Sequence, residues 1–339
     1  MGRVRQFGEL WHQIETWLGE QWKRPARMRP PQHVLVTGAT GPIGHALVSS
    51  LTAQGTRVRV LVQAAPRPRS LPWPNVELIY TDLATPNVEL ILRAVSGCSV
   101  IFHLAAVTGE TNPQRLYVVN VRGTKILVEA ARLAGVARFV MVSTLATVGR
   151  PWNALTESES WLRQATHYVR SRFLAEEVAL LASHKGLWVN VLNLPAVVAP
   201  RMPVAHPLVT WLVDESPAWQ ALPEAAPVHL VALKDVVTLL MAAAAGRERF
   251  FGRLVPLSPD GDLTPHELAR MWDDLGISPT RLRPVQFAWR DHPPVYYRLV
   301  ASEPGVRHRH LSVPAKPLVR SLLKHVAGAD RWVPSYAVR

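Results

Sequence analysis

Cysteine is almost absent from this chain, because Cys98 is the only one in 339 residues. A single thiol excludes an internal disulfide and any metal site built from several cysteines. The chain also lacks an apolar run close to the roughly twenty residues that span a bilayer. Its first residues lack the apolar core and cleavage site of a signal peptide. We therefore expect a cytoplasmic protein.

Acidic residues are scarce relative to basic ones: 25 Asp and Glu stand against 38 Lys and Arg, for a net charge of +13. Such a surface attracts phosphorylated ligands, anionic lipid, acidic proteins or nucleic acid. Nucleic acid is the least favoured of these partners, because no basic and aromatic array suits base stacking. The histidines never take the helical i, i+4 spacing with acidic neighbours that binds metal, so we expect no metal site.

The most informative motif follows an apolar, β-branched run at residues 33–37. Gly38, Gly41 and Gly44 come next at three-residue spacing, then an amphipathic pattern and a second apolar run at residues 58–62. This order predicts a strand, a helix and a parallel strand. Gly38 would permit the tight turn, Gly41 would let the backbone approach a pyrophosphate, and Gly44 would let helix pack on strand. An ordinary glycine turn in a parallel sheet is the alternative.

Apolar strand patterns continue to alternate with helical patterns as far as Pro195. This rhythm predicts an α/β doubly wound parallel sheet, the Rossmann fold. We assign residues 32–195 to a dinucleotide-binding domain. Residues 196–339 would form mainly a small C-terminal substrate lobe and a basic tail, with a return to the sheet near 228–245. The expected strands are 76–80, 99–104, 139–142 and 188–192, and the expected long helices are 113–134 and 168–183.

Residues 1–31 form an extension that the glycine motif does not require. Between residues 7 and 22, apolar side chains, three of them tryptophan, repeat at helical spacing and predict an amphipathic helix, which a proline-rich linker follows. The apolar stripe would pack on the chain's own body or on a second copy. Docking to a larger protein complex, with help from the basic tail, and peripheral binding to an anionic membrane surface are the alternatives.

Several motifs stand in order along the chain at separations that one family shares. They are Thr37-Gly38-Ala39-Thr40-Gly41-Pro42-Ile43-Gly44, Asp82-Leu83, His103-Leu104-Ala105-Ala106, Asn120-Val121-Arg122-Gly123-Thr124, Val142-Ser143-Thr144 and Tyr168-Val169-Arg170-Ser171-Arg172. With these motifs the chain resembles the extended short-chain dehydrogenases/reductases of the NAD-dependent epimerase/dehydratase superfamily. Within it, the chain is similar to the dihydroflavonol-reductase-like and hopanoid-associated sugar-epimerase-like branch. The resemblance covers roughly residues 33–275.

The resemblance implies where a dinucleotide would bind. Asp82 would accept a hydrogen bond from the adenine amino group, and Ala105 and Ala106 would line the cofactor channel. The cofactor-binding positions that it implies are Gly38, Thr40, Gly41, Pro42, Ile43, Gly44, Asp82, Leu83, Leu104, Ala105, Ala106, Asn120, Tyr168, Arg172 and Pro195.

The resemblance also implies a catalytic set. Thr144 would hold the substrate oxygen, and Tyr168 would donate or accept the proton. A free tyrosine, with a pKa of about 10, is a poor base at neutral pH unless a cation stabilises its phenolate. Arg172 stands one helical turn later, where the family has lysine. It supplies the charge, but its planar guanidinium is bulkier than an ammonium group.

The type of cofactor depends on the end of the second strand. An NAD site usually has an acidic residue there to bind the ribose hydroxyls. This chain has Gln63 there, no acid nearby, and the arginines Arg67 and Arg69 a few residues later. Either arginine could pair with a 2′-phosphate. NADP(H) is therefore favoured over NAD(H), with Gln63 and Arg67 among the cofactor-binding residues.

The sequence favours an NADP(H)-dependent oxidoreductase that transfers hydride to or from a carbonyl or alcohol on a largely apolar small molecule. A sugar epimerase or dehydratase is less favoured, because residues 195–227 are poor in the cationic side chains that bind nucleotide-sugar diphosphates. Arg172 and other departures from the family pattern leave a further alternative. The chain would then be a catalytically impaired subunit that holds nucleotide within a larger complex.

Overall fold

The computed structural model describes residues 33–63, 73, 75–108, 112–148, 150–151, 166–199, 229–246, 252–261, 263–275, 297–298, 306–310 and 312–327. The predicted helix between residues 7 and 22 lies outside these residues. So do Arg67, Arg69 and, within the predicted substrate lobe, residues 200–228.

One parallel sheet forms the centre of the described structure, with strand order β12-β10-β7-β5-β4-β1-β2-β3. The order reverses at β1, because β2 and β3 lie to one side of it and β4, β5 and β7 lie to the other. The sequence prediction of a doubly wound Rossmann sheet is therefore confirmed. The strands are β1 His33–Thr37, β2 Arg57–Val62, β3 Glu77–Tyr80, β4 Val100–His103, β5 Arg138–Thr144, β7 Trp188–Leu194, β10 Gly252–Leu257 and β12 Val306–His310.

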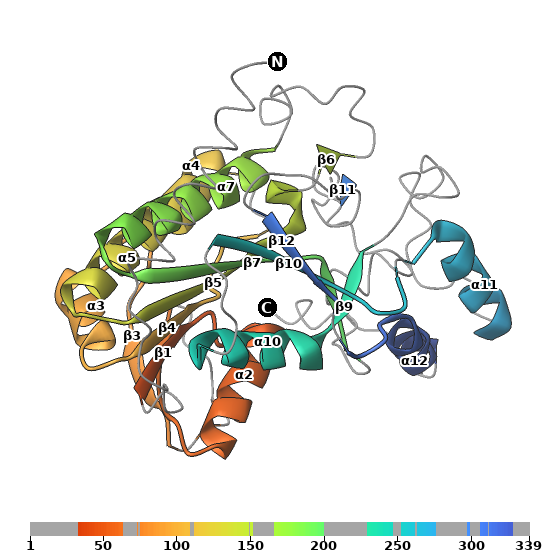
Figure 1. Cartoon of the computed structure of the whole chain (residues 1–339), viewed down its shortest axis with the longest axis horizontal. Helices are drawn as coiled ribbons and strands as arrows, with labels where there is room; N and C mark the ends of the chain where they lie inside the picture. The colour runs from red at the N-terminus through yellow and green to blue at the C-terminus, as the bar shows by residue number, and fades with distance from the viewer. Residues whose placement is uncertain are drawn as a thin grey trace, which may run out of the picture.

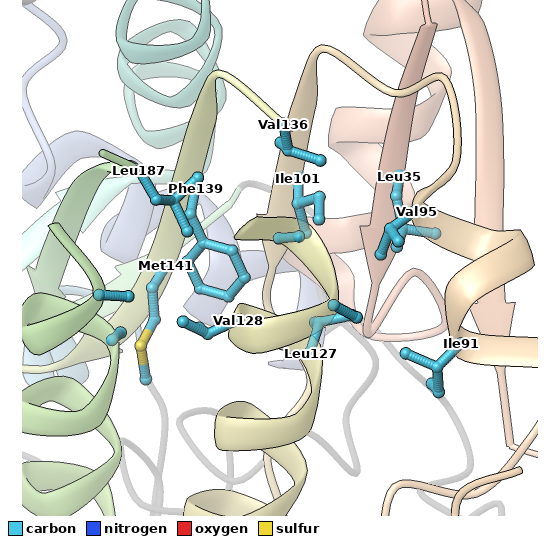
Figure 2. Packing of buried hydrophobic residues seen from close by; sticks show 14 of the residues in the cluster. Leu35, Ile91, Val95, Ile101, Leu127, Val128, Val136, Phe139, Met141 and Leu187 are labelled. Atoms are coloured by element: carbon cyan, nitrogen blue, oxygen red, sulfur yellow. The ribbon is translucent and has the colours of Figure 1, made fainter. Parts of the chain in front are cut away.

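Helices cover both faces of this sheet (Figure 1). On one face pack α3 Val88–Val95, α5 Thr124–Leu133 and α7 His167–Leu181, and on the other α2 Pro42–Ala53 and α10 Leu233–Ala244. Successive β1 side chains point to opposite faces: Val34 and Val36 join the core beneath α2 and α10, and Leu35 joins the core beneath α3 and α5. Figure 2 shows the second core, to which Leu127 and Val128 of α5 and Phe139 of β5 contribute.

The predicted single helix over residues 113–134 is three consecutive segments. A short α-helix, α4 Pro113–Leu116, leads into a π-helical segment, η1 Tyr117–Gly123, and then into α5. The apolar spacing of the sequence did not indicate the wider π turn. Here Gly123 packs so closely on Leu83 that a Cβ on the glycine would lie 3.0 Å from the Leu83 Cβ. Insertions of this kind often mark functional positions.

The chain returns to the main sheet later than predicted. The return predicted near 228–245 is wrong for the strand in that stretch: β9 Leu230–Ala232 pairs with β8 Ala196–Val198 in a separate two-stranded sheet. The strands that extend the main sheet are β10 and β12. The predicted stretch still packs on the main fold, because α10 contacts α2 and β5, and β9 contacts β10.

The predicted basic tail is in part folded structure. Residues 306–310 form β12, and Lys316–Ala327 form α12, which contacts α11 Pro265–Leu275. Asp235 binds the intervening turn by accepting hydrogen bonds from the backbone N–H groups of Ser312 and Val313. The sequence of residues 306–310 did not predict a strand, because it is mostly basic and contains no apolar run.

The remaining short elements are η2 Leu145–Thr147, η3 Ala182–Lys185 and an antiparallel pair of strands, β6 Arg150–Pro151 and β11 Tyr297–Arg298. None of the helices in the described part of the chain is both long and apolar enough to cross a membrane.

Candidate cofactor and active site

Two glycines of the motif are required by the protein's own backbone. Gly38, directly after β1, has φ +74°, and a Cβ there would lie 2.6 Å from the backbone nitrogen of Ala105. A Cβ on Gly44 would lie 2.2 Å from the carbonyl oxygen of Gly38. Both distances are shorter than real Cβ contacts allow, so a side chain at either position would displace the loop between β1 and α2.

Gly41, unlike Gly38 and Gly44, has room for a side chain. A Cβ there would meet only the Gly38 carbonyl oxygen, at an ordinary 3.5 Å. Gly41 caps α2 without a side-chain hydrogen bond, and the adjacent Thr40 and Pro42 are exposed. The open side of this residue therefore faces the positive end of the α2 dipole, which is the environment that a diphosphate group prefers. The loop fits the dinucleotide that the sequence predicts.

A buried hydrogen-bond chain supports the loop from below. The Ala105 N–H donates to the Thr37 Oγ1 (3.2 Å), which lies 2.8 Å from the His103 Nδ1. The His103 Nε2 lies 2.8 Å from the Thr124 Oγ1, which donates to the Asn120 carbonyl oxygen (2.6 Å). Because the Thr124 hydroxyl hydrogen goes to Asn120, the His103 Nε2 donates to Thr124. Burial of the ring favours the neutral imidazole, in which the Nδ1 accepts from the Thr37 hydroxyl.

The pKa of His103 reflects this position. It is lowered from 6.5 to about 3, mainly because burial disfavours the charged ring and also because the positive charge of Arg172 lies nearby. A group that binds its proton more weakly in the folded state stabilises the fold at pH values above its unfolded pKa. This contribution disappears as the pH falls from about 6.5 towards 3.

We expect His103 to make the protein acid-sensitive. Between pH 7 and pH 5 the free energy of unfolding should fall by about 2 kcal/mol from this residue alone. Urea unfolding at the two pH values measures the change. His103→Gln, which keeps one donor and one acceptor but does not titrate, is the control and should lose about 2 kcal/mol less. Equal losses in the two proteins would show that His103 does not titrate as assigned.

Asn120, one of the predicted cofactor-binding residues, joins two parts of the protein through its side chain. It is fully buried, its Oδ1 accepts from the Val107 N–H (2.8 Å), and its Nδ2 donates to the Val107 carbonyl and to the Ser171 Oγ (3.0 Å). Ser171 in turn donates to the Tyr168 carbonyl oxygen. The side chain of Asn120 therefore ties the loop after β4 to the first turn of α7.

The predicted adenine side of the site lies at the ends of β2 and β3. Gln63 and Asp82 meet there, with the Gln63 Nε2 3.3 Å from the Asp82 Oδ2. The Asp82 Oδ1 accepts from the Ala84 N–H. Leu83 is buried against Gly123, so it shapes the wall behind this edge. Among the other predicted cofactor residues, Ile43, Leu104, Ala105 and Ala106 are partly buried, and Pro195 is buried.

The predicted catalytic residues come from two neighbouring elements. Thr144 ends β5 and caps η2, where its Oγ1 accepts from the Ala146 N–H. Tyr168 and Arg172 lie one turn apart on α7, which packs against β5 and η2. The Arg172 Nη2 donates to the Val142 carbonyl, two residues before Thr144 on β5. The fold thus brings the three predicted residues to the same edge of the sheet.

One nitrogen of Arg172 has no hydrogen-bond partner among the residues that the structure describes. The residue is 2% exposed, and its Nη1 is buried without a hydrogen bond. A buried guanidinium nitrogen without an acceptor is costly, and such groups in native proteins usually serve a ligand or water. The orphaned donor therefore fits a bound dinucleotide, whose ribose hydroxyls are acceptors of the right kind.

The pKa of Tyr168 is raised above its usual value. Burial raises it, the positive charge of Arg172 lowers it, and the negative charge of Glu176 raises it again. We predicted that the cation would favour the phenolate, and Arg172 does act in that direction. Burial outweighs it, so the pKa of the hydroxyl is raised overall. Tyr168 is therefore suited to donate a proton to a developing oxyanion.

Sequence reasoning missed a buried polar cluster beside these residues. Glu176, fully buried on α7, accepts from the Ser143 Oγ, from the Asn193 Nδ2 (3.0 Å) and from the Arg253 Nε (2.7 Å). Asn193 of β7 also donates to the Thr147 Oγ1. The signal in the sequence was a glutamate at i+4 from Arg172, which reads as an ordinary helical ion pair. Within the described residues, no three His, Cys, Asp or Glu side chains are placed to hold a metal ion.

Comparison with known proteins places this site in a family. Residues 34–215 match the NAD dependent epimerase/dehydratase family, which is more than half of the chain. The chain belongs to the NAD dependent epimerase/dehydratase family. The resemblance inferred from the motifs is thereby confirmed.

Individual known proteins match part of the chain. Sterol demethylase protein B of Methylococcus capsulatus is 36% identical over 171 residues, which are 49% of this chain and 52% of the relative. Ceramide reductase of Caulobacter vibrioides is 31% identical over 209 residues, 62% of this chain and 60% of the relative. The chain thus spans little more than half the length of these curated relatives. The structure of UDP-glucose 4-epimerase from Thermus thermophilus in complex with NAD shares the fold. It has a TM-score of 0.59 and 23% identity, over 88% of this chain and 99% of that one.

Proposed function

We propose that the chain is an NADP(H)-dependent oxidoreductase that reduces a carbonyl group on a largely apolar small molecule. The observation that carries the proposal is the position of Tyr168 on α7, one helical turn before an arginine whose buried Nη1 has no partner among the described residues. Two relatives are named for a sterol and a ceramide, which are apolar molecules.

The residues divide the work of reduction. A bound nicotinamide supplies the hydride for the carbonyl carbon. Thr144 would hold the carbonyl oxygen, and Tyr168 would donate its hydroxyl proton to that oxygen as negative charge develops, which gives the alcohol. The positive charge of Arg172 stabilises the phenolate that remains, because it lowers the pKa of Tyr168. Solvent would then return the proton to Tyr168.

Purified protein tests the proposal through nucleotide binding and turnover. NADPH and NADH are titrated by fluorescence, and NADPH oxidation is followed at 340 nm with apolar ketones and aldehydes, steroids and long-chain ketones among them. We expect micromolar binding and carbonyl-dependent oxidation. Nucleotide binding without oxidation of any carbonyl would leave a nucleotide-holding subunit as the better description. Interconversion of UDP-sugars without net oxidation would indicate an epimerase.

The proposed preference for NADP(H) over NAD(H) can be tested at Arg67. Gln63 at the end of β2 presents no carboxylate to repel a 2′-phosphate, and Arg67 follows it in the sequence. Arg67→Gln should weaken NADPH binding about tenfold or more and leave NADH binding within about twofold. Fluorescence titration with both nucleotides measures the ratio. Equal weakening for both nucleotides would mean that Arg67 does not contact the 2′-phosphate.

A further inference from the structure

Glu176 could pair with either of two arginines, Arg172 or Arg253, and in the structure it pairs with Arg253. On α7 it stands at i+4 from Arg172, the spacing at which a carboxylate and a guanidinium usually pair. The structure instead pairs it with Arg253, which lies 77 residues further along the chain on β10. Arg172 meanwhile donates to the Val142 carbonyl, and within the described part of the chain its Nη1 has no partner.

Arg253 is held firmly in this position. Its Nε donates to the Glu176 Oε2 at 2.7 Å, its Nη2 contacts the Glu177 carboxylate, and its guanidinium lies 5.4 Å from the centre of the Phe173 ring. Burial lowers the pKa of Arg253, but the negative charges of Glu176 and Glu177 outweigh burial and raise it overall. The pair is therefore charged.

A fully buried carboxylate cannot remain without a cation at low cost. If Arg253 were removed, the next guanidinium on the same helix face would be Arg172, whose free nitrogen is already buried. Arg172 would then turn towards Glu176, and its Nη1 would gain a partner within the protein. It would no longer be available to an acceptor on a bound ligand.

We infer that Arg253 is a positioning residue for the nucleotide site: by pairing with Glu176 it keeps Arg172 free to bind an acceptor on the nicotinamide nucleotide. The inference rests on the proposed function, because it takes the nucleotide as the ligand of Arg172. Arg253 affects the site only by pairing with Glu176 and so leaving Arg172 free. It lies on β10, which β7, β5 and β4 separate from β1 and the glycine loop.

The test is a set of variants whose nucleotide affinity is measured by fluorescence titration. Arg253→Met should weaken NADPH binding about tenfold or more, the cost of one lost hydrogen bond to a charged group. Adding Glu176→Gln removes the carboxylate that captures Arg172, so the double variant should bind within about threefold of the wild type. Arg253→Lys, which keeps the charge, should also bind like the wild type. A merely structural ion pair would leave the double variant as weak as the single one.

The outcomes separate this inference from the proposed function. A wild type that binds neither NADPH nor NADH refutes the proposed function. A wild type that binds, with unchanged affinity in Arg253→Met, refutes the inference alone, and so does a double variant that stays weak. If Arg253→Met does not fold by circular dichroism, Arg253→Gln replaces it, because glutamine still donates to Glu176. We then expect a smaller loss of affinity that Glu176→Gln again reverses, and an irreversible loss would overturn the inference.

Discussion

Replacing Tyr168 with phenylalanine should lower kcat for carbonyl reduction by about 10²- to 10⁴-fold, the usual contribution of a positioned proton donor. The substitution removes one hydroxyl and leaves the ring and its helix in place, so NADPH affinity should change by less than about threefold. Steady-state rates and fluorescence titration measure the two quantities. The raised pKa of Tyr168 also predicts that the alkaline loss of wild-type activity begins above the range of an ordinary tyrosine.

Tyr117→Phe is the matched control for this experiment. Tyr117 lies on η1, and its hydroxyl is 3.4 Å from the His167 Nδ1, beside the same end of α7. We expect its removal to change kcat by less than about twofold, since the proposed proton transfer does not use it. Comparable losses in the two variants, or survival of activity in Tyr168→Phe, would mean that another group supplies the proton.

Two substitutions in the glycine loop, Gly44→Ala and Gly41→Ala, should affect stability and nucleotide binding separately. Gly44→Ala places a methyl group 2.2 Å from the Gly38 carbonyl oxygen, and this backbone clash should reduce the free energy of unfolding by about 3 kcal/mol or more. Gly41→Ala places its methyl group at an ordinary 3.5 Å, and the φ of −78° at Gly41 is accessible to alanine. It should therefore change stability by less than about 1 kcal/mol.

Gly41→Ala, which should leave stability nearly unchanged, should have a large effect on nucleotide binding. Gly41→Ala should weaken NADPH binding by about tenfold or more, because its methyl group occupies the space through which a diphosphate approaches the backbone. Urea unfolding and fluorescence titration on the same samples separate the two effects. If Gly41→Ala binds NADPH like the wild type, the diphosphate does not lie at this loop.

Much of the fold was predictable because its signals are local. The glycines sit three residues apart, and the apolar runs around them are only a few residues long, so the turn from β1 to α2 follows from neighbouring residues. The π segment and β12 were not predictable in this way. Tertiary packing of Gly123 on Leu83 accompanies the first, and backbone pairing with β10 defines the second.

By itself, the sequence determined the Rossmann sheet and the glycine loop, since both depend on residue types at short spacing, and its resemblance to a family implied the roles predicted for Thr144, Tyr168 and Arg172. Only the tertiary structure decided which charge each buried group meets. Glu176 pairs with Arg253 across 77 positions in preference to Arg172 four positions away, and burial outweighs Arg172 in raising the pKa of Tyr168. Desolvation and pairing depend on what the folded chain brings together, and residue spacing along a helix does not contain that information.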